Sequence, residues 1–214
     1  MSTNQINAEL EFPDNKKAQP NAPILEAMRE RWSPRAFDAS RPVSAQDLTT
    51  IFEAARWAAS SYNEQPWRFV VGRKGDATWQ KIFDTLIPGN QAWAQFAPVL
   101  LITFAKKTFS HDGSQNKYGF HDIGAALAHI MLEATALGLH THGMAGFDYA
   151  KARQTFGVPD DFEVGAACAI GYLGDPNELQ GWQRDAELKP RTRKPLDELV
   201  FADTWGTSAN FWHQ

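Results

Sequence analysis

The sequence has almost no cysteine and no long apolar run, and each absence excludes a class of structure. Its 214 residues include a single cysteine, Cys168, so no disulfide can form within the chain. No apolar run approaches the ~18 residues that a membrane-spanning helix needs. The N-terminus is polar and lacks the apolar core of a signal peptide. Together these absences lead us to expect a cytoplasmic protein.

The short motifs of several common enzyme classes are also missing. No GxxxxGK(S/T) segment is present and no GxGxxG follows a predicted strand, which excludes a P-loop and a Rossmann fingerprint. No GxSxG nucleophile elbow is present. Cys168 lies in an apolar run, which favours an inert core residue over a nucleophile. Three histidines occur close together, at a spacing that fits no usual metal-ligand pattern, so we expect no metal site: His129, His140 and His142.

The composition is that of a globular protein with an acidic balance. Hydrophobic residues make up 43% of the chain and charged residues 21%. The net charge of −4 disfavours nucleic acid as a partner, so the local basic stretches fit a small anion better. Eight tryptophans and fourteen phenylalanines are available to fill a core or to line a site for a flat ligand.

Helical and strand patterns alternate along the chain without repeats or a linker, which predicts one layered domain, α+β or α/β, over residues 22–214. Residues 1–21 are polar and predict a flexible N-terminal tail. Residues 174–195 are predicted to be irregular, and residues 196–212 to form an extended C-terminal arm. The predicted helices are one beginning near Pro23, then 44–59, 77–86, 90–96, 122–137 and 148–156. The predicted strands are 67–72, 99–105 and 163–173, of which the last two read as central.

Two segments point beyond a simple monomeric core. The helix predicted over 122–137 is apolar nearly all round, so a partner subunit is a plausible cover for it. The polar stretch 106–119 is long for a loop in a compact domain, which is typical of a lid or a binding loop.

Two basic stretches far apart in the sequence are candidates for one anion site. Arg31 and Arg35 flank Ser33, and Arg191 and Arg193 lie near the other end of the chain. Guanidinium groups carry a rigid fork of donors that fits phosphate oxygens. If the fold brings the two stretches together, four or five cations surround one anion.

A polar stretch and a glycine-rich loop complete the candidate site. Asn63 and Gln65 carry amide groups that suit the alternating C=O and N–H edge of a heterocycle. The segment 141–147 is rich in glycine, which lets backbone amides approach a ligand. A phosphate tail joined to a flat ring with a polar edge describes a mononucleotide-like cofactor, and flavin mononucleotide (FMN) fits best.

The chain resembles the FMN-dependent nitroreductase family from about Ile24 to Val200. Four segments carry the resemblance, in the family's order: Arg31-Trp32-Ser33-Pro34-Arg35, Ser60-Ser61-Tyr62-Asn63-Glu64-Gln65-Pro66-Trp67-Arg68-Phe69-Val70-Val71, Gly143-Met144-Ala145-Gly146-Phe147-Asp148 and Arg191-Thr192-Arg193-Lys194-Pro195-Leu196. The resemblance implies a nitroreductase-like α+β fold with a central mixed sheet flanked by helices. It also implies an intertwined homodimer with two FMN sites at the interface, each built from both chains.

The resemblance also implies roles for individual residues. Arg31, Ser33, Arg191 and Arg193 would hold the phosphate and ribityl chain. Arg35, Asn63 and Gln65 would lie at the pyrimidine edge of the ring, and the backbone amide of Gly146 would approach the central-ring nitrogen. The full predicted cofactor-binding set is Arg31, Trp32, Ser33, Arg35, Asn63, Gln65, Met144, Ala145, Gly146, Arg191 and Arg193.

The implied reaction is a ping-pong transfer of a hydride from NADH or NADPH to a nitro, quinone or enone-like acceptor, without an indispensable catalytic side chain. Ala145 stands where many family members have an acidic residue, and Trp32 could pack on the ring or fill the core. Three alternatives stay open: a flavin-dependent dehydrogenase or dehalogenase that uses no nicotinamide, a non-catalytic flavin-binding module, and an anion-binding structural dimer without flavin.

Overall fold

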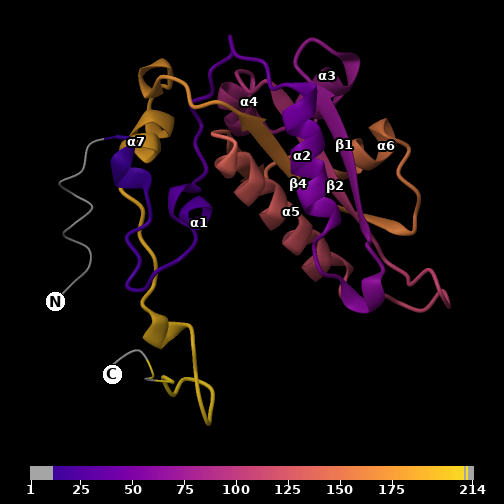
Figure 1. Cartoon of the computed structure of the whole chain (residues 1–214). Helices are drawn as coiled ribbons and strands as arrows, with labels where there is room; N and C mark the ends of the chain where they lie inside the picture. Colours follow the sequence, from indigo (N-terminus) through magenta and orange to yellow (C-terminus); the bar gives the residue numbers. More distant parts are fainter. Residues whose placement is uncertain (1–11, 210, 212–214) are drawn as a thin grey trace.

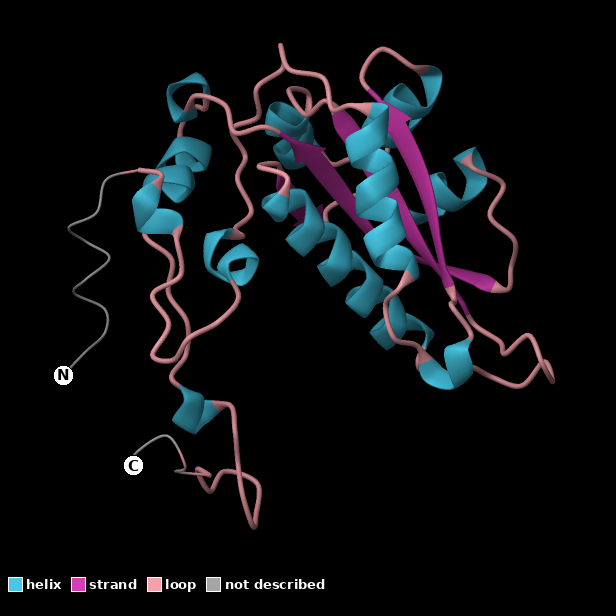
Figure 2. Cartoon of the chain, in the orientation of Figure 1, coloured by secondary structure: helices cyan, strands magenta, loops and turns pink. Residues whose placement is uncertain are grey.

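The computed structural model describes residues 12–209 and residue 211. In this part of the chain, helices pack against both faces of one four-stranded sheet, which confirms the predicted α+β class (Figures 1 and 2). The strands are β1 (Trp67–Arg73), β2 (Val99–Lys106), β3 (His140–Met144) and β4 (Phe162–Gly171). The helices are α1 (Glu26–Glu30), α2 (Ala45–Arg56), α3 (Ala77–Phe83), α4 (Pro88–Ala94), α5 (Gly119–Ala136), α6 (Tyr149–Thr155) and α7 (Trp182–Leu188). Short 3-10 helices are η2 (Asp14–Lys16), η3 (Ser61–Asn63), η4 (Pro176–Glu178) and η5 (Leu196–Glu198).

The sheet has the order β1-β2-β4-β3, and every pairing between these strands is antiparallel. The expectation of a mixed sheet is therefore corrected for the described residues. The reason lies in the connection through α3 and α4, which returns the chain to the end where β1 finished, so that Arg73 pairs with Val99. The apolar runs at 99–105 and 163–173 predicted central strands, and β2 and β4 occupy the centre.

Two apolar layers hold the helices to the sheet. On one face, Trp79 of α3 and Trp93 of α4 are buried against the strands. On the other face, Ile51 of α2 and Ile123 and Ile130 of α5 are buried. Burial of large side chains on both faces explains why the central strands are continuous apolar runs rather than alternating ones.

The helix predicted over 44–59 is present as α2. The Ser44 hydroxyl accepts a hydrogen bond of 2.9 Å from the backbone N–H of Asp47, which is the expected N-terminal cap. The first helix begins at Glu26 instead of near Pro23, and no side chain caps it. Helix α7 lies in a stretch that we expected to be irregular. It buries the polar side chains Gln183 and Glu187, so its sequence carries no apolar period.

Helix α5 is covered on one side only. Its buried positions include Ile130 and Ala134, whereas Gly124 and Ala128 are exposed. In Figure 1, α1, α7 and the C-terminal arm form a separate layer beside the sheet body. Leu25, which precedes α1, is 68% exposed. Such exposed apolar positions beside a half-covered helix leave room for the partner subunit that the sequence predicted.

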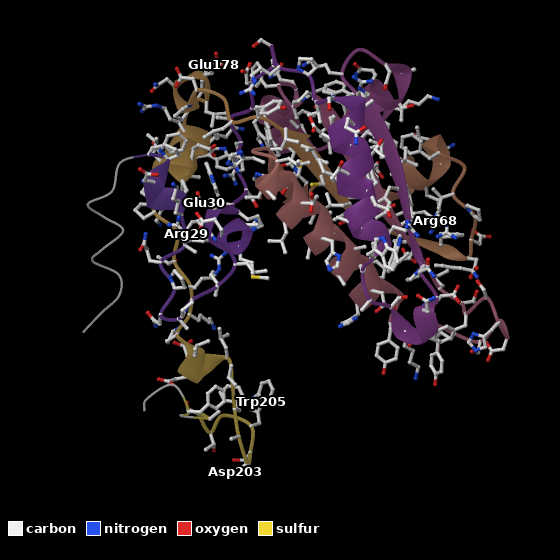
Figure 3. The ribbon with its side chains drawn as sticks, viewed as in Figure 1. Arg29, Glu30, Arg68, Glu178, Asp203 and Trp205 are labelled. Carbon is white, nitrogen blue, oxygen red and sulfur yellow. The ribbon has the colours of Figure 1, made fainter. Side chains whose placement is uncertain are left out.

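The two ends of the chain differ from one another. Of the predicted flexible tail 1–21, residues 1–11 lie outside the described residues, whereas residues 12–18 pack against the C-terminal end of α7. The C-terminal arm is extended, and Trp205 near its tip is exposed (Figure 3). In the described part of the chain, no helix has both the length and the apolar character needed to cross a bilayer.

The glycine at position 72 is required by the packing of α3 on β1. A Cβ atom there would lie 2.2 Å from the backbone nitrogen of Trp79. Because a backbone atom cannot move aside without displacing α3, we expect Gly72→Ala to lower the free energy of unfolding by about 1–3 kcal/mol. Urea unfolding at fixed protein concentration measures this. Gly89→Ala is the control, because nothing lies within 4 Å of its added methyl group. Equal effects of the two substitutions would contradict this packing.

Candidate functional site

The fold brings the two basic stretches together. Arg31 follows the last turn of α1, and its Nη1 lies 3.2 Å from the Ser33 hydroxyl, to which it donates. Burial, followed by the charge of Arg193, lowers the pKa of Arg31. Burial and the charges of Arg31 and Arg193 lower the pKa of Arg191 to about 10. Three guanidinium groups from opposite ends of the sequence therefore share one region of positive potential.

A buried carboxylate organises the backbone beside these cations. The side chain of Glu187 is fully buried and accepts hydrogen bonds from the backbone N–H groups of Arg35, at 2.9 and 3.0 Å, and of Ala36, at 3.1 Å. Burial raises the pKa of Glu187, although these bonds and the nearby charges of Lys16 and Arg35 oppose the shift. Helix α7 thus fixes the segment that carries Arg31, Ser33 and Arg35.

Arg35 is half-buried at the edge of this cluster. Its guanidinium lies 5.2 Å from the ring centroid of Trp182, in a cation–π contact. Its Nε is buried and has no hydrogen-bond partner among the described residues. An unsatisfied buried donor costs free energy unless a ligand or water meets it, so Arg35 has a donor to offer.

Two histidines of β3 line the same region in the neutral form. Burial lowers the pKa of His140 and of His142 to about 4, with a smaller contribution from Arg31 at His140 and from Arg35 and Arg31 at His142. The neutral His142 donates its Nδ1–H to the carbonyl of Pro34, at 2.8 Å, which supports the turn between the arginines. Sequence reasoning considered these residues only as metal ligands, and no cluster fit to bind a metal is found among the described residues.

Trp32 fills the core beside the cluster. Its side chain is 6% exposed and packs edge-on to His140 at 5.9 Å. The ammonium of Lys16 lies 5.1 Å from its ring centroid. Of the two roles that the sequence left open for Trp32, the structure favours packing.

The glycine-rich loop follows β3. Met144 is buried, Ala145 is exposed, and Gly146 is half-buried. The carbonyl of Gly146 accepts hydrogen bonds from Asn90 Nδ2, at 2.9 Å, and from the backbone N–H of Ile87, at 3.2 Å. A Cβ atom at Gly146 would lie 2.7 Å from the Ile87 side chain. The N–H of Gly146 meets no acceptor among the described residues, so it is available to a ligand.

The turn that carries Asn63 and Gln65 lies elsewhere. Tyr62, Asn63 and Gln65 have positive φ angles of 51°, 55° and 52°. The turn is held by the backbone N–H of Ser61, which donates to Asp122 in the first turn of α5 at 2.9 Å. Backbone strain of this kind persists where the surrounding structure fixes it, and it is frequent in ligand-binding turns.

The loop 106–119, which we expected to be a lid or a binding loop, packs on this turn. The Phe109 ring meets Tyr62 edge-on at 5.6 Å. The carboxylate of Glu64 accepts hydrogen bonds from the backbone N–H and the hydroxyl of Ser110. The loop is thereby held next to the predicted ring-binding amides.

Helix α5 separates the two parts of the predicted site. Asn63 and Gln65 lie at its N-terminal end, whereas the basic cluster lies beside β3, which begins four residues after α5 ends. The 18 residues of α5 span about 27 Å. Figure 1 shows the same separation, with α1 and α7 far from the turn that joins α2 to β1. One chain therefore does not bring all the predicted residues together.

Comparison with known proteins assigns the family. The model of the Nitroreductase family matches residues 28–90 and 76–172, which is more than half of the chain. The chain belongs to the nitroreductase family.

Two of the proteins similar to this nitroreductase-family chain match most of its length, and a third matches about a third of it. A crystal structure of an oxidoreductase containing FMN has a TM-score of 0.85 and 36% identity, and covers 93% of this chain and 100% of that one. An NADH dehydrogenase of Thermus thermophilus is 28% identical over 211 residues, covering 83% of this chain and 96% of that protein. The major NAD(P)H-flavin oxidoreductase of Aliivibrio fischeri is 40% identical over 69 residues, covering 32% of this chain and 31% of that protein.

Sequence reasoning missed two charged residues that lie beside the basic cluster. Lys16 lay in the stretch expected to be a tail, and Glu187 lay in the stretch expected to be irregular. Both are buried, and a buried charge is rarely visible in sequence because its partners lie far away. No local signal distinguishes Glu187, because Asp185 lies two residues before it in the same helix.

The neutral histidines predict how stability depends on pH. Their pKa is about 4 in the folded chain and about 6.5 when unfolded, so the unfolded chain binds more protons between these values. This contribution to stability is complete above about pH 6.5 and is lost as the pH falls towards about 4. We expect His140→Phe to reduce the fall in the free energy of unfolding between about pH 7 and about pH 4.5, as measured by urea unfolding.

His111→Phe is the matched control, because the side chain of His111 is 56% exposed. We expect it to retain the wild-type pH dependence. A His140→Phe protein with an unchanged pH dependence would contradict the role of burial at this position.

Proposed function

We propose that this protein is an FMN-dependent oxidoreductase of the cytoplasm that transfers a hydride from NADH or NADPH to nitro, quinone or enone-like acceptors by a ping-pong mechanism. The observation that carries the proposal is the convergence of Arg31, Arg191 and Arg193 in one region. In addition to burial, Arg193 lowers the pKa of Arg31, and Arg31 and Arg193 lower that of Arg191, which shows that their positive charges lie close enough together to act on one anion. A phosphate monoester, with its two negative charges, matches such a cluster.

The residues of the chain fit FMN in type. Arg31, Ser33, Arg191 and Arg193 would hold the phosphate and ribityl chain. The spare donor of Arg35 suits the polar edge of the ring, and the N–H of Gly146 suits the central-ring nitrogen. The buried side chains of Trp32 and Met144 would support the site from beneath, with the exposed Ala145 at its surface.

When bound, FMN would supply the hydride chemistry, taking two electrons from the nicotinamide and giving them to the acceptor. The chain would supply charge, position and access. Arg35 would place positive charge where negative charge develops on reduction, which would be a preorganised electrostatic effect. With pKa values of about 4, His140 and His142 stay neutral near pH 7 and add no further positive charge to the cluster of arginines. No side chain of the described site is assigned a catalytic acid–base role.

We further propose that two copies of the chain form each site. Because α5 separates the basic cluster from Asn63 and Gln65, the partner's equivalent turn would complete the site. The exposed small residues of α5 (Gly124 and Ala128) and the exposed Leu25 offer an apolar surface for that partner. In a symmetric dimer, two such composite sites follow from one interface.

An absorption spectrum tests the proposed function. We expect the purified protein, alone or after incubation with FMN, to show flavin bands that bleach under anaerobic NADH or NADPH and return when an acceptor is added. Bands that persist with both nicotinamides would favour the dehydrogenase or dehalogenase alternative. Bleaching without turnover of any acceptor would favour a binding module, and a protein that never binds flavin would overturn the site.

A mixture of two variants tests the composite site. Arg193→Ala and Asn63→Ala should each weaken FMN binding, the first by about 1–3 kcal/mol because a charge-assisted contact is lost. In a heterodimer of the two, one site would contain both substitutions and the other would contain neither. We therefore expect co-refolded heterodimers to regain up to half of the wild-type activity.

The control for this mixture is Arg184→Ala, because Arg184 is exposed and bonds to Asn177 on the outer side of α7. We expect it to bind FMN as the wild type does. A heterodimer no more active than its parents would show that each site is built within a single chain.

A further inference from the structure

The segment from Phe12 to Ala18 is attached to three parts of the basic site. The backbone N–H of Ala18 donates to the carbonyl of Arg29 in α1, at 2.8 Å. Nη1 of Arg191 donates to the carbonyl of Lys16, at 2.6 Å. The ring of Phe12 meets Trp32 edge-on at 5.8 Å. This segment therefore joins the two basic stretches from outside.

The same segment caps the C-terminal end of α7. Asn15 Nδ2 donates to the carbonyl of Leu188, at 2.8 Å. The ammonium of Lys16 donates to the carbonyls of Ala186, at 3.1 Å, and of Lys189. The last carbonyls of a helix have no partner within the helix, and a cation at this end is favourable. Asn15 and Lys16 thus fix the last turn of α7, which holds Glu187.

Lys16 also places a buried charge inside the site. It is 4% exposed, with its ammonium over the Trp32 ring. Burial, together with Arg35 and Arg191, lowers the pKa of Lys16, and the attraction of Glu187 only partly opposes this. A buried ammonium beside two guanidinium groups is unfavourable by itself. The presence of Lys16 at this position is accounted for if the site needs both the hydrogen bonds of the ammonium and its positive charge.

We infer that residues 12–18 are a positioning element for the phosphate-binding arginines, with Lys16 as its central residue. Lys16 acts through others: its carbonyl orients Arg191, and its ammonium, bonded to the carbonyl of Lys189, fixes the chain that leads from α7 to Arg191. This inference rests on the proposed function, because it assumes that the basic cluster binds the phosphate of FMN. The proposed reaction does not require it.

Binding of FMN and of riboflavin separates a positioning role from a merely structural one, because riboflavin lacks the phosphate. We expect Lys16→Met to raise the Kd of the full-length apoprotein for FMN about tenfold and to leave the Kd for riboflavin unchanged. Flavin fluorescence quenching measures both constants. Lys16→Arg keeps a cation able to reach the same carbonyls and should retain most of the FMN affinity.

Lys81→Met is the matched control, since Lys81 is exposed on α3, away from the segment 12–18, and the variant should bind FMN as the wild type does. If Lys16→Met does not fold, Asn15→Ala, which removes one cap bond, should show a smaller loss for FMN alone.

Three results would overturn the inference. A Lys16→Met protein with wild-type FMN affinity would overturn it while leaving the proposed function intact. Equal losses for FMN and riboflavin would show a structural role only. A wild-type protein with no preference for FMN over riboflavin would overturn both the phosphate site and the inference.

Discussion

The arrangement of the candidate site depends on the hydrogen bonds that the carboxylate of Glu187 accepts from the backbone. This carboxylate is fully buried, it accepts the backbone N–H groups of Arg35 and Ala36, and it faces the positive charges of Lys16 and Arg35. Without a partner, a buried carboxylate would be strongly unfavourable, and here backbone donors and cations offset that cost. One side chain on a short helix thereby ties the segment after α1 to the end of the chain, across about 150 residues of sequence.

The length of α5 imposes a second constraint. The helix lies against the sheet and keeps the basic cluster away from the turn of Asn63 and Gln65. If these two groups of residues belong to one site, as proposed, an interface between two copies of the chain would have to reunite them. Cofactor binding and dimer formation would then be linked, because a ligand held by both chains stabilises their association.

Much of this fold is visible in the sequence, but the bonds that organise the site are not. The cap at Ser44 and the apolar runs of β2 and β4 are local signals, and the structure confirms them. Helix α7 was missed because it buries polar residues, and the role of Lys16 was missed because its partners lie about 170 residues away. The motif residues could be named by resemblance, but no local pattern shows that α5 keeps them apart.

Backbone carbonyls contribute to the orientation of the cations in the candidate site. On the surface, arginines pair with carboxylates, as Arg29 does with Glu26 and Glu30 (Figure 3). In the candidate site, Arg191 donates to the carbonyl of Lys16, and Arg193 donates to the carbonyl of Thr192. A carbonyl fixes the direction of a guanidinium without cancelling its charge. Donors that are oriented before an anion arrives lose little freedom on binding, which would favour the phosphate group of the proposed cofactor.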